Sequence, residues 1–113
     1  MPRDNGAKGR EEELRAARFL ESSGYRVVQR NVRLPGGEID LVCRDGEMLV
    51  FVEVKARTTG RFGSALGAVD SRKRATLRRL AADYVQILAP NARVRFDVVA
   101  VDGNRMTLHR NAF

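Results

Sequence analysis

The sequence predicts a single α/β domain, and two observations support this fold class. Segments with apolar residues at helical spacing interleave with segments rich in β-branched and apolar residues, in the order helix, three strands, helix, two strands. The length of 113 residues suffices for one hydrophobic core but not comfortably for two. We therefore treat residues 1–113 as one domain.

The N-terminal segment divides into a polar start and a helix. Residues 1–10 are polar and contain two glycines and a proline, so we expect a flexible N-terminus there. A helix is expected over residues 11–22, because Leu14, Ala17 and Leu20 recur at helical spacing. Three glutamates begin this helix, where its dipole favours negative charge.

Three strands are expected next, over residues 25–32, 38–44 and 47–57. The first two are separated by a Pro-Gly-Gly turn. Asp45 and Gly46 separate the second and third, and this pair is a strong signal for a two-residue hairpin turn.

The second half of the chain contains a loop, a helix and two strands. Residues 58–67 hold three glycines and show no periodicity, which predicts a loop. Asp70 or Ser71 can cap a helix that extends to about Leu88. The last two strands are expected over residues 93–101 and 105–109.

Acidic residues interrupt the apolar pattern of the predicted hairpin. If Asp45 and Gly46 are the two turn residues, Asp40 faces Phe51 and Glu38 faces Glu53. Alternation then puts Glu38, Asp40, Glu53 and Lys55 on one face of the sheet. The opposite face is expected to be wholly apolar, with Ile39, Leu41, Cys43, Met48, Val50, Val52 and Val54.

Facing acids destabilise a strand pair unless positive charge lies between them. Hard oxygen ligands without a nearby histidine or thiol suit Mg²⁺ or Mn²⁺, and no other cofactor is expected. Asp40 and Glu53 are the expected first ligands, and Lys55 can orient or activate a water that attacks a phosphodiester. A purely structural cluster of ion pairs is the alternative interpretation.

These motifs resemble a known group of proteins. Glu38-Ile39-Asp40-Leu41-Val42, followed by Glu53-Val54-Lys55, looks like the PD-(D/E)xK nuclease superfamily. The whole chain resembles the small bacterial YraN family, which is described as Holliday-junction-resolvase-like. The further matching segments are Glu13 with Ala16–Leu20, Gly24-Tyr25, Arg30-Asn31, Ala56-Arg57, Phe62-Gly63, Val69, Lys73 and Arg95–Val99.

The resemblance implies a restriction-endonuclease-like core, α-β-β-β-α-β(-β), in which helices flank a mixed central sheet. It also implies that Asp40 and Glu53 hold the metal and that Lys55 serves the attacking water. A glutamate on the first helix would be a further ligand, which is expected to be Glu13, with Glu11 and Glu12 left open. Glu38 and Lys73 are expected to lie near these ligands without binding the metal directly.

The charge of the chain points to a polyanionic partner. The net charge is +7 and the computed pI is about 10.7, which favours nucleic acid. The nuclease resemblance makes DNA the expected nucleic acid. Composition alone does not separate DNA from RNA or from an acidic membrane surface. The side chains expected to contact phosphates are Arg57, Arg61, Arg72, Lys73 and Arg74.

The leading hypothesis is thus a Mg²⁺-dependent endonuclease acting on DNA, with branched or junction DNA as a substrate. A catalytically inactive nucleic-acid-binding protein and an interaction protein with a structural acid cluster are the alternatives. A homodimer would allow both strands to be cut symmetrically. The single cysteine, Cys43, and the lack of a signal sequence or membrane span favour the cytoplasm.

Overall fold

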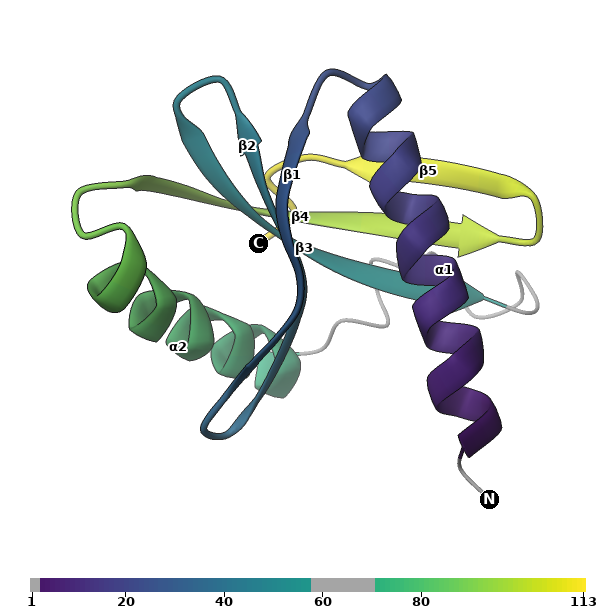
Figure 1. Ribbon diagram of the computed structural model, residues 1–113, viewed down its shortest axis with the longest axis horizontal. Coiled ribbons are helices and arrows are strands. Elements are labelled where there is room, and N and C mark those ends of the chain that lie inside the picture. Colours follow the sequence, from purple (N-terminus) through teal and green to yellow (C-terminus); the bar gives the residue numbers. More distant parts are fainter. Residues whose placement is uncertain (1–2, 58–70) are drawn as a thin grey trace.

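The computed structural model describes the backbone of residues 3–57 and 71–113, with side chains from Gly9 to Ala56 and from Ser71 onward. Five strands form one sheet in the order β1-β2-β3-β4-β5, in which β3 and β4 are parallel and the other neighbours antiparallel (Figure 1). This mixed sheet and its two helices confirm the predicted fold class. The elements are α1 (Arg3–Ser22), β1 (Arg26–Leu34), β2 (Gly37–Asp45), β3 (Met48–Arg57), α2 (Ser71–Leu88), β4 (Arg93–Asp102) and β5 (Arg105–His109).

Each helix covers one face of the sheet. Leu20 of α1 packs with Leu41, Val50 and other apolar residues of one face, and Leu80 of α2 packs with Phe51 and other residues of the opposite face. Full burial of a side chain of this size stabilises the fold by about 1.5–3 kcal/mol. Cys43 is buried in the apolar core between α1 and the sheet, as expected from the apolar pattern of its strand.

The predicted turn between β2 and β3 was wrong by one residue. Asp45 pairs with Met48, so the turn residues are Gly46 and Glu47, and Gly46 adopts a φ of 63°. Glycine is favoured at the first turn position of such hairpins because it adopts positive φ without a steric penalty. Consequently Val42, and not Asp40, pairs with Phe51, and the expected pairing of Glu38 with Glu53 is not formed.

Two further expectations were wrong. The helix α1 begins at Arg3, so residues 3–10 continue the helix instead of forming a loose start. Each glycine in this segment lowers helix propensity by only about 1 kcal/mol, which an adjoining stable helix can tolerate. Ile39 packs with the residues that α2 covers and not with Leu41, so the expected apolar face is interrupted there. The neighbouring strand β1 is irregular near this point, with a bulge between Val27 and Gln29 and a positive φ at Asn31.

Within the described ranges, neither helix is long and apolar enough to cross a membrane. The helices instead present one apolar side to the sheet. On α2 that side consists of Leu77, Leu80, Ala81 and Tyr84.

A buried polar network ties the end of α1 to β4 and the C-terminal segment. The carboxylate of Asp97 is fully buried and accepts hydrogen bonds from the Tyr25 hydroxyl (2.5 Å), the Arg95 Nε (2.9 Å) and the Asn111 backbone N–H (2.9 Å). Arg95 also pairs with Asp45 at 2.9 Å. Asp97 is therefore a structural acid, and its charge is offset by Arg95.

We expect Tyr25→Phe to lower the free energy of unfolding by about 1.5–3 kcal/mol, because the buried carboxylate of Asp97 loses a hydrogen bond. Urea unfolding followed by circular dichroism measures this loss. Tyr84→Phe is the matched control, because the Tyr84 hydroxyl donates to the exposed Gln29 (3.1 Å) and its loss should cost less. Equal losses in the two variants would contradict the assignment.

Candidate functional site

Three polar residues occupy neighbouring register positions on adjacent strands: Asn31 on β1, Asp40 on β2 and Glu53 on β3. The pairs Arg30–Leu41 and Val32–Ile39 bracket Asn31 and Asp40. The ladder between β2 and β3 ends at the pair Leu41–Val52, one residue before Asp40 and Glu53. There the Asp40 Oδ2 accepts a hydrogen bond from the Val54 backbone N–H at 2.9 Å. Asp40 therefore replaces a main-chain acceptor where the two strands part.

The carboxyl groups of Glu13 and Glu53 both reach Asp40. The charge of Asp40 acts on both groups, although Glu13 comes from α1 and Glu53 from β3. Burial, followed by the charge of Asp40, raises the pKa of Glu13 to about 8 and that of Glu53 to about 7. With these pKa values, Glu13 and Glu53 keep part of their protons at neutral pH.

One carboxylate oxygen of Glu53 forms an ion pair, and the other has no hydrogen-bond partner. The side chain is only 5% exposed, and its Oε2 forms an ion pair with Lys73 Nζ at 3.3 Å. Lys73 lowers the pKa of Glu53 and so partly opposes the effect of burial. The Oε1 atom is buried without a hydrogen-bond partner, which is rare for a carboxylate and costly without a ligand.

Asn31 is a site residue that the sequence interpretation missed. Its side-chain amide donates to Glu13 and to the Glu38 Oε2 at 3.0 Å. The sequence signals were a polar Asn inside a run of strand-forming residues and the matching segment Arg30-Asn31, and neither reveals a partner on a distant helix. Glu38 thus contacts the site through Asn31, and its charge also raises the pKa of Glu13.

The other predicted site residues have varied positions. Lys55 is half-buried and shares the Glu53 face by alternation, but the ammonium that pairs with Glu53 belongs to Lys73. Among the first three glutamates of the sequence, Glu13 is the one that meets the acids, whereas Glu11 is exposed.

The predicted phosphate contacts are only partly described. Arg61 and the side chain of Arg57 lie outside the described residues. Arg72 is exposed at the start of α2. The guanidinium of Arg74 lies 5.7 Å from the centre of the Phe113 ring, so it contacts an aromatic side chain of its own chain.

The donor chemistry of the site fits a hard divalent cation. Glu13, Asp40 and Glu53 offer carboxylate oxygens, and Glu53 Oε1 has no other partner. Within residues 3–57 and 71–113, no three acidic, His or Cys side chains are already arranged around one point as metal ligands. A cation would therefore have to displace protons from Glu13 and Glu53 and turn the carboxyl groups toward itself.

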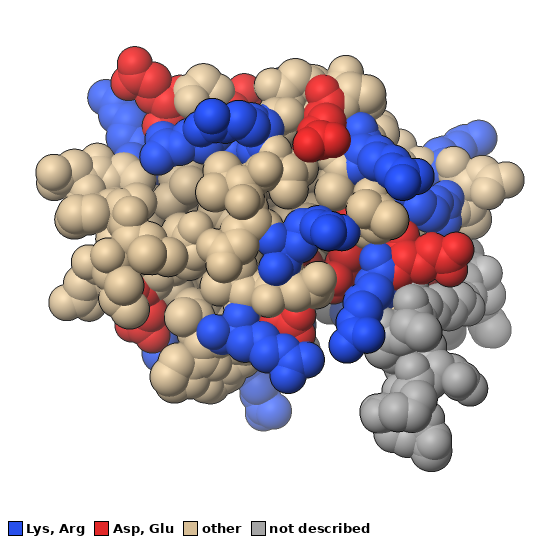
Figure 2. Space-filling view, viewed as in Figure 1, with Lys and Arg blue, Asp and Glu red and all other residues tan. Residues whose placement is uncertain are grey.

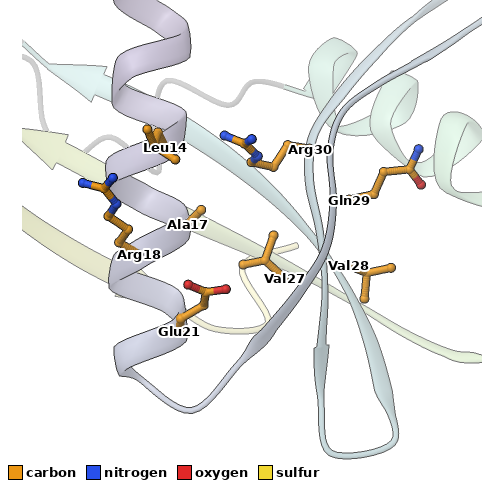
Figure 3. A pocket seen from close by; sticks show the side chains of 8 residues that line it. All are labelled: Leu14, Ala17, Arg18, Glu21, Val27, Val28, Gln29 and Arg30. Atoms are coloured by element: carbon orange, nitrogen blue, oxygen red, sulfur yellow. The ribbon is translucent and has the colours of Figure 1, made fainter.

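A groove of about 370 Å³ lies between α1 and β1 (Figure 3). Its apolar lining includes Leu14, Ala17 and Val27, and Arg30 points from β1 toward α1. Glu13, Asp40 and Glu53 are not among the residues that line it. Figure 2 shows further Lys and Arg side chains spread over one face of the molecule, with acidic side chains between them.

In metal-free buffer, the stability contribution of this site should fall as the pH rises from about 5 to about 8. The folded protein keeps protons on Glu13 and Glu53 up to pKa values of about 8 and about 7, whereas the unfolded chain releases them near 4.5. The unfolded state then binds fewer protons than the folded state, so increasing pH favours unfolding. Urea titrations at several pH values, with a chelator present, measure this slope.

The double variant Glu13→Gln/Glu53→Gln is the matched control, because neither amide titrates. It should lose most of this slope. A slope that is the same in both proteins, or a stability that rises over this pH range, would contradict the pKa assignment.

Comparison with known proteins agrees with the full-length resemblance. Residues 12–101 match the model of the uncharacterised protein family UPF0102. A UPF0102 protein of Dechloromonas aromatica is 49% identical over 107 residues, which cover 95% of this chain and 88% of the relative. UPF0102 proteins of Shewanella loihica (46% identity, 94% and 93% coverage) and Moorella thermoacetica (50%, 83% and 79%) are similar. The chain therefore belongs to the UPF0102 family, which is the YraN family that its motifs resemble.

Proposed function

We propose that this protein is a metal-dependent endonuclease that hydrolyses phosphodiester bonds in DNA, with branched or junction DNA as the favoured substrate. The observation that carries the proposal is the convergence of Glu13, Asp40 and Glu53 from three different elements. Mutual repulsion and burial both oppose this arrangement in the ionised state. A divalent cation would offset this repulsion and burial of charge. The clustering of acids beside a lysine therefore supports a role in binding Mg²⁺ or Mn²⁺.

Each residue of the site has a separate task in this proposal. A bound divalent cation supplies Lewis-acid stabilisation of the charge that develops on the phosphate. Asp40, held by the Val54 N–H, presents its carboxylate in a fixed orientation, and Glu53 offers its unpartnered oxygen. Lys55, on the same face as Glu53, orients a water for attack or offsets phosphate charge. Lys73 limits the cost of burying Glu53.

Basic side chains near the site support DNA as the substrate. Arg30 lines the groove between α1 and β1 and directly precedes Asn31 in the chain, and Arg72 is exposed near Lys73 at the start of α2. The net charge of +7 adds long-range attraction for a polyanion. Each chain offers one such site, so we propose that two copies act together where two strands are cut.

A nucleic-acid-binding protein without catalysis is the second candidate function. The ion pair between Lys73 and Glu53, together with the hydrogen bond from the Val54 N–H to Asp40, stabilises the acids in the absence of a metal. A protein of this kind needs the basic surface but not a cation at Glu53.

Asp40→Asn and Glu53→Gln should each lower Mn²⁺-dependent cleavage of junction, flap or duplex DNA by about 100-fold or more. Glu47→Gln is the matched control. Glu47 is an exposed acid in the β2–β3 turn, and its substitution removes one negative charge, as each site variant does. Cleavage is measured with end-labelled substrates on gels. Equal cleavage by the control and the site variants would identify a contaminating nuclease and remove the enzyme proposal.

DNA binding distinguishes the two candidates. Arg30→Gln should weaken binding and reduce the slope of log affinity against log salt concentration by about 1, because one phosphate contact is lost. Arg105→Gln, an exposed arginine on β5, should change neither quantity. Fluorescence anisotropy in a salt series measures both. Salt-dependent binding without any cleavage would favour the non-catalytic protein.

A further inference from the structure

Asn31 adopts a backbone conformation that is unusual inside a strand. Its φ is 54°, in the left-handed region, although it lies in the middle of β1. Within the described part of the chain, Asn111 is the only other non-glycine residue with positive φ. Asn tolerates this region better than most residues, but such outliers persist mainly where the surrounding structure requires them.

This conformation serves the acid cluster. The neighbouring pairs Arg30–Leu41 and Val32–Ile39 keep their register, so β1 and β2 remain paired on both sides of Asn31. The amide of Asn31 donates one hydrogen bond to Glu13 of α1 and another, at 3.0 Å, to Glu38 of β2. One neutral side chain therefore joins a helix and a strand by contacting a carboxyl group on each.

We propose that Asn31 is the positioning residue that holds Glu13 against Asp40. The contact supplies two donors without adding charge. A lysine or arginine at this position would neutralise the acids and compete with a cation, whereas an amide leaves their negative charge available. In its role toward a metal ion this inference rests on the proposed function, because Glu13 would then be a ligand and Asn31 its outer partner.

Asn31→Gly tests this role, because glycine keeps the positive φ and removes only the side-chain amide. Mn²⁺ binding, measured by calorimetry, should weaken by about 10- to 100-fold. Asn111→Gly is the matched control. It has the same backbone conformation (φ 52°) but lies beside Asp97, so its Mn²⁺ affinity should equal that of the unchanged protein. Unchanged affinity in Asn31→Gly, together with weakened affinity in Glu13→Gln, would overturn the proposal.

A second measurement needs no metal and separates this inference from the proposed function. The thermal unfolding midpoints of Asn31→Gly, Glu13→Gln and the double variant form a cycle. If Asn31 acts through Glu13, the two shifts should be clearly non-additive, whereas Asn111→Gly and Glu13→Gln should add. Additive shifts in the first cycle would overturn the role of Asn31. Absence of Mn²⁺ binding with a non-additive cycle would instead reject the metal site and retain the positioning role.

Discussion

The contact of three carboxyl groups around Asp40 is the constraint on which the site depends. Asp40 lies where the β2–β3 ladder ends, and its side chain takes over a main-chain hydrogen bond at that point. The sheet alone would bring together only Asp40 and Glu53. The two helices complete the cluster from outside the sheet, since α1 contributes Glu13 and α2 contributes Lys73.

Two buried acids differ in how fully their carboxylate oxygens are hydrogen-bonded. Asp97 is completely buried, and donors from Tyr25, Arg95 and the Asn111 backbone satisfy both its oxygens. Glu53 is almost as buried, yet one of its oxygens has no partner and its pKa is raised to about 7. Asp97 therefore joins the C-terminal segment to the fold, while Glu53 retains a capacity to bind something further.

Part of the site could be predicted although the hairpin register was wrong by two residues. Side-chain direction in a strand repeats every two residues, so an error of two does not reverse it. Asp40 and Glu53 therefore remain close neighbours on adjacent strands in either register, whereas the expected Glu38–Glu53 pairing depended on the turn and failed. Sequence could not choose among Glu11, Glu12 and Glu13, because only helix packing orients α1. It also could not reveal Asn31, whose role requires a left-handed backbone and partners on two other elements.

The central claim is that Glu13 and Glu53 hold protons that a divalent cation must displace. The most direct measurement is calorimetry of Mn²⁺ binding at pH 7 in two buffers with different ionisation enthalpies, which counts the protons released. From pKa values of about 8 and about 7, the account predicts release of at least about one proton per ion bound. Binding without proton release, or no binding to the folded protein, would contradict it.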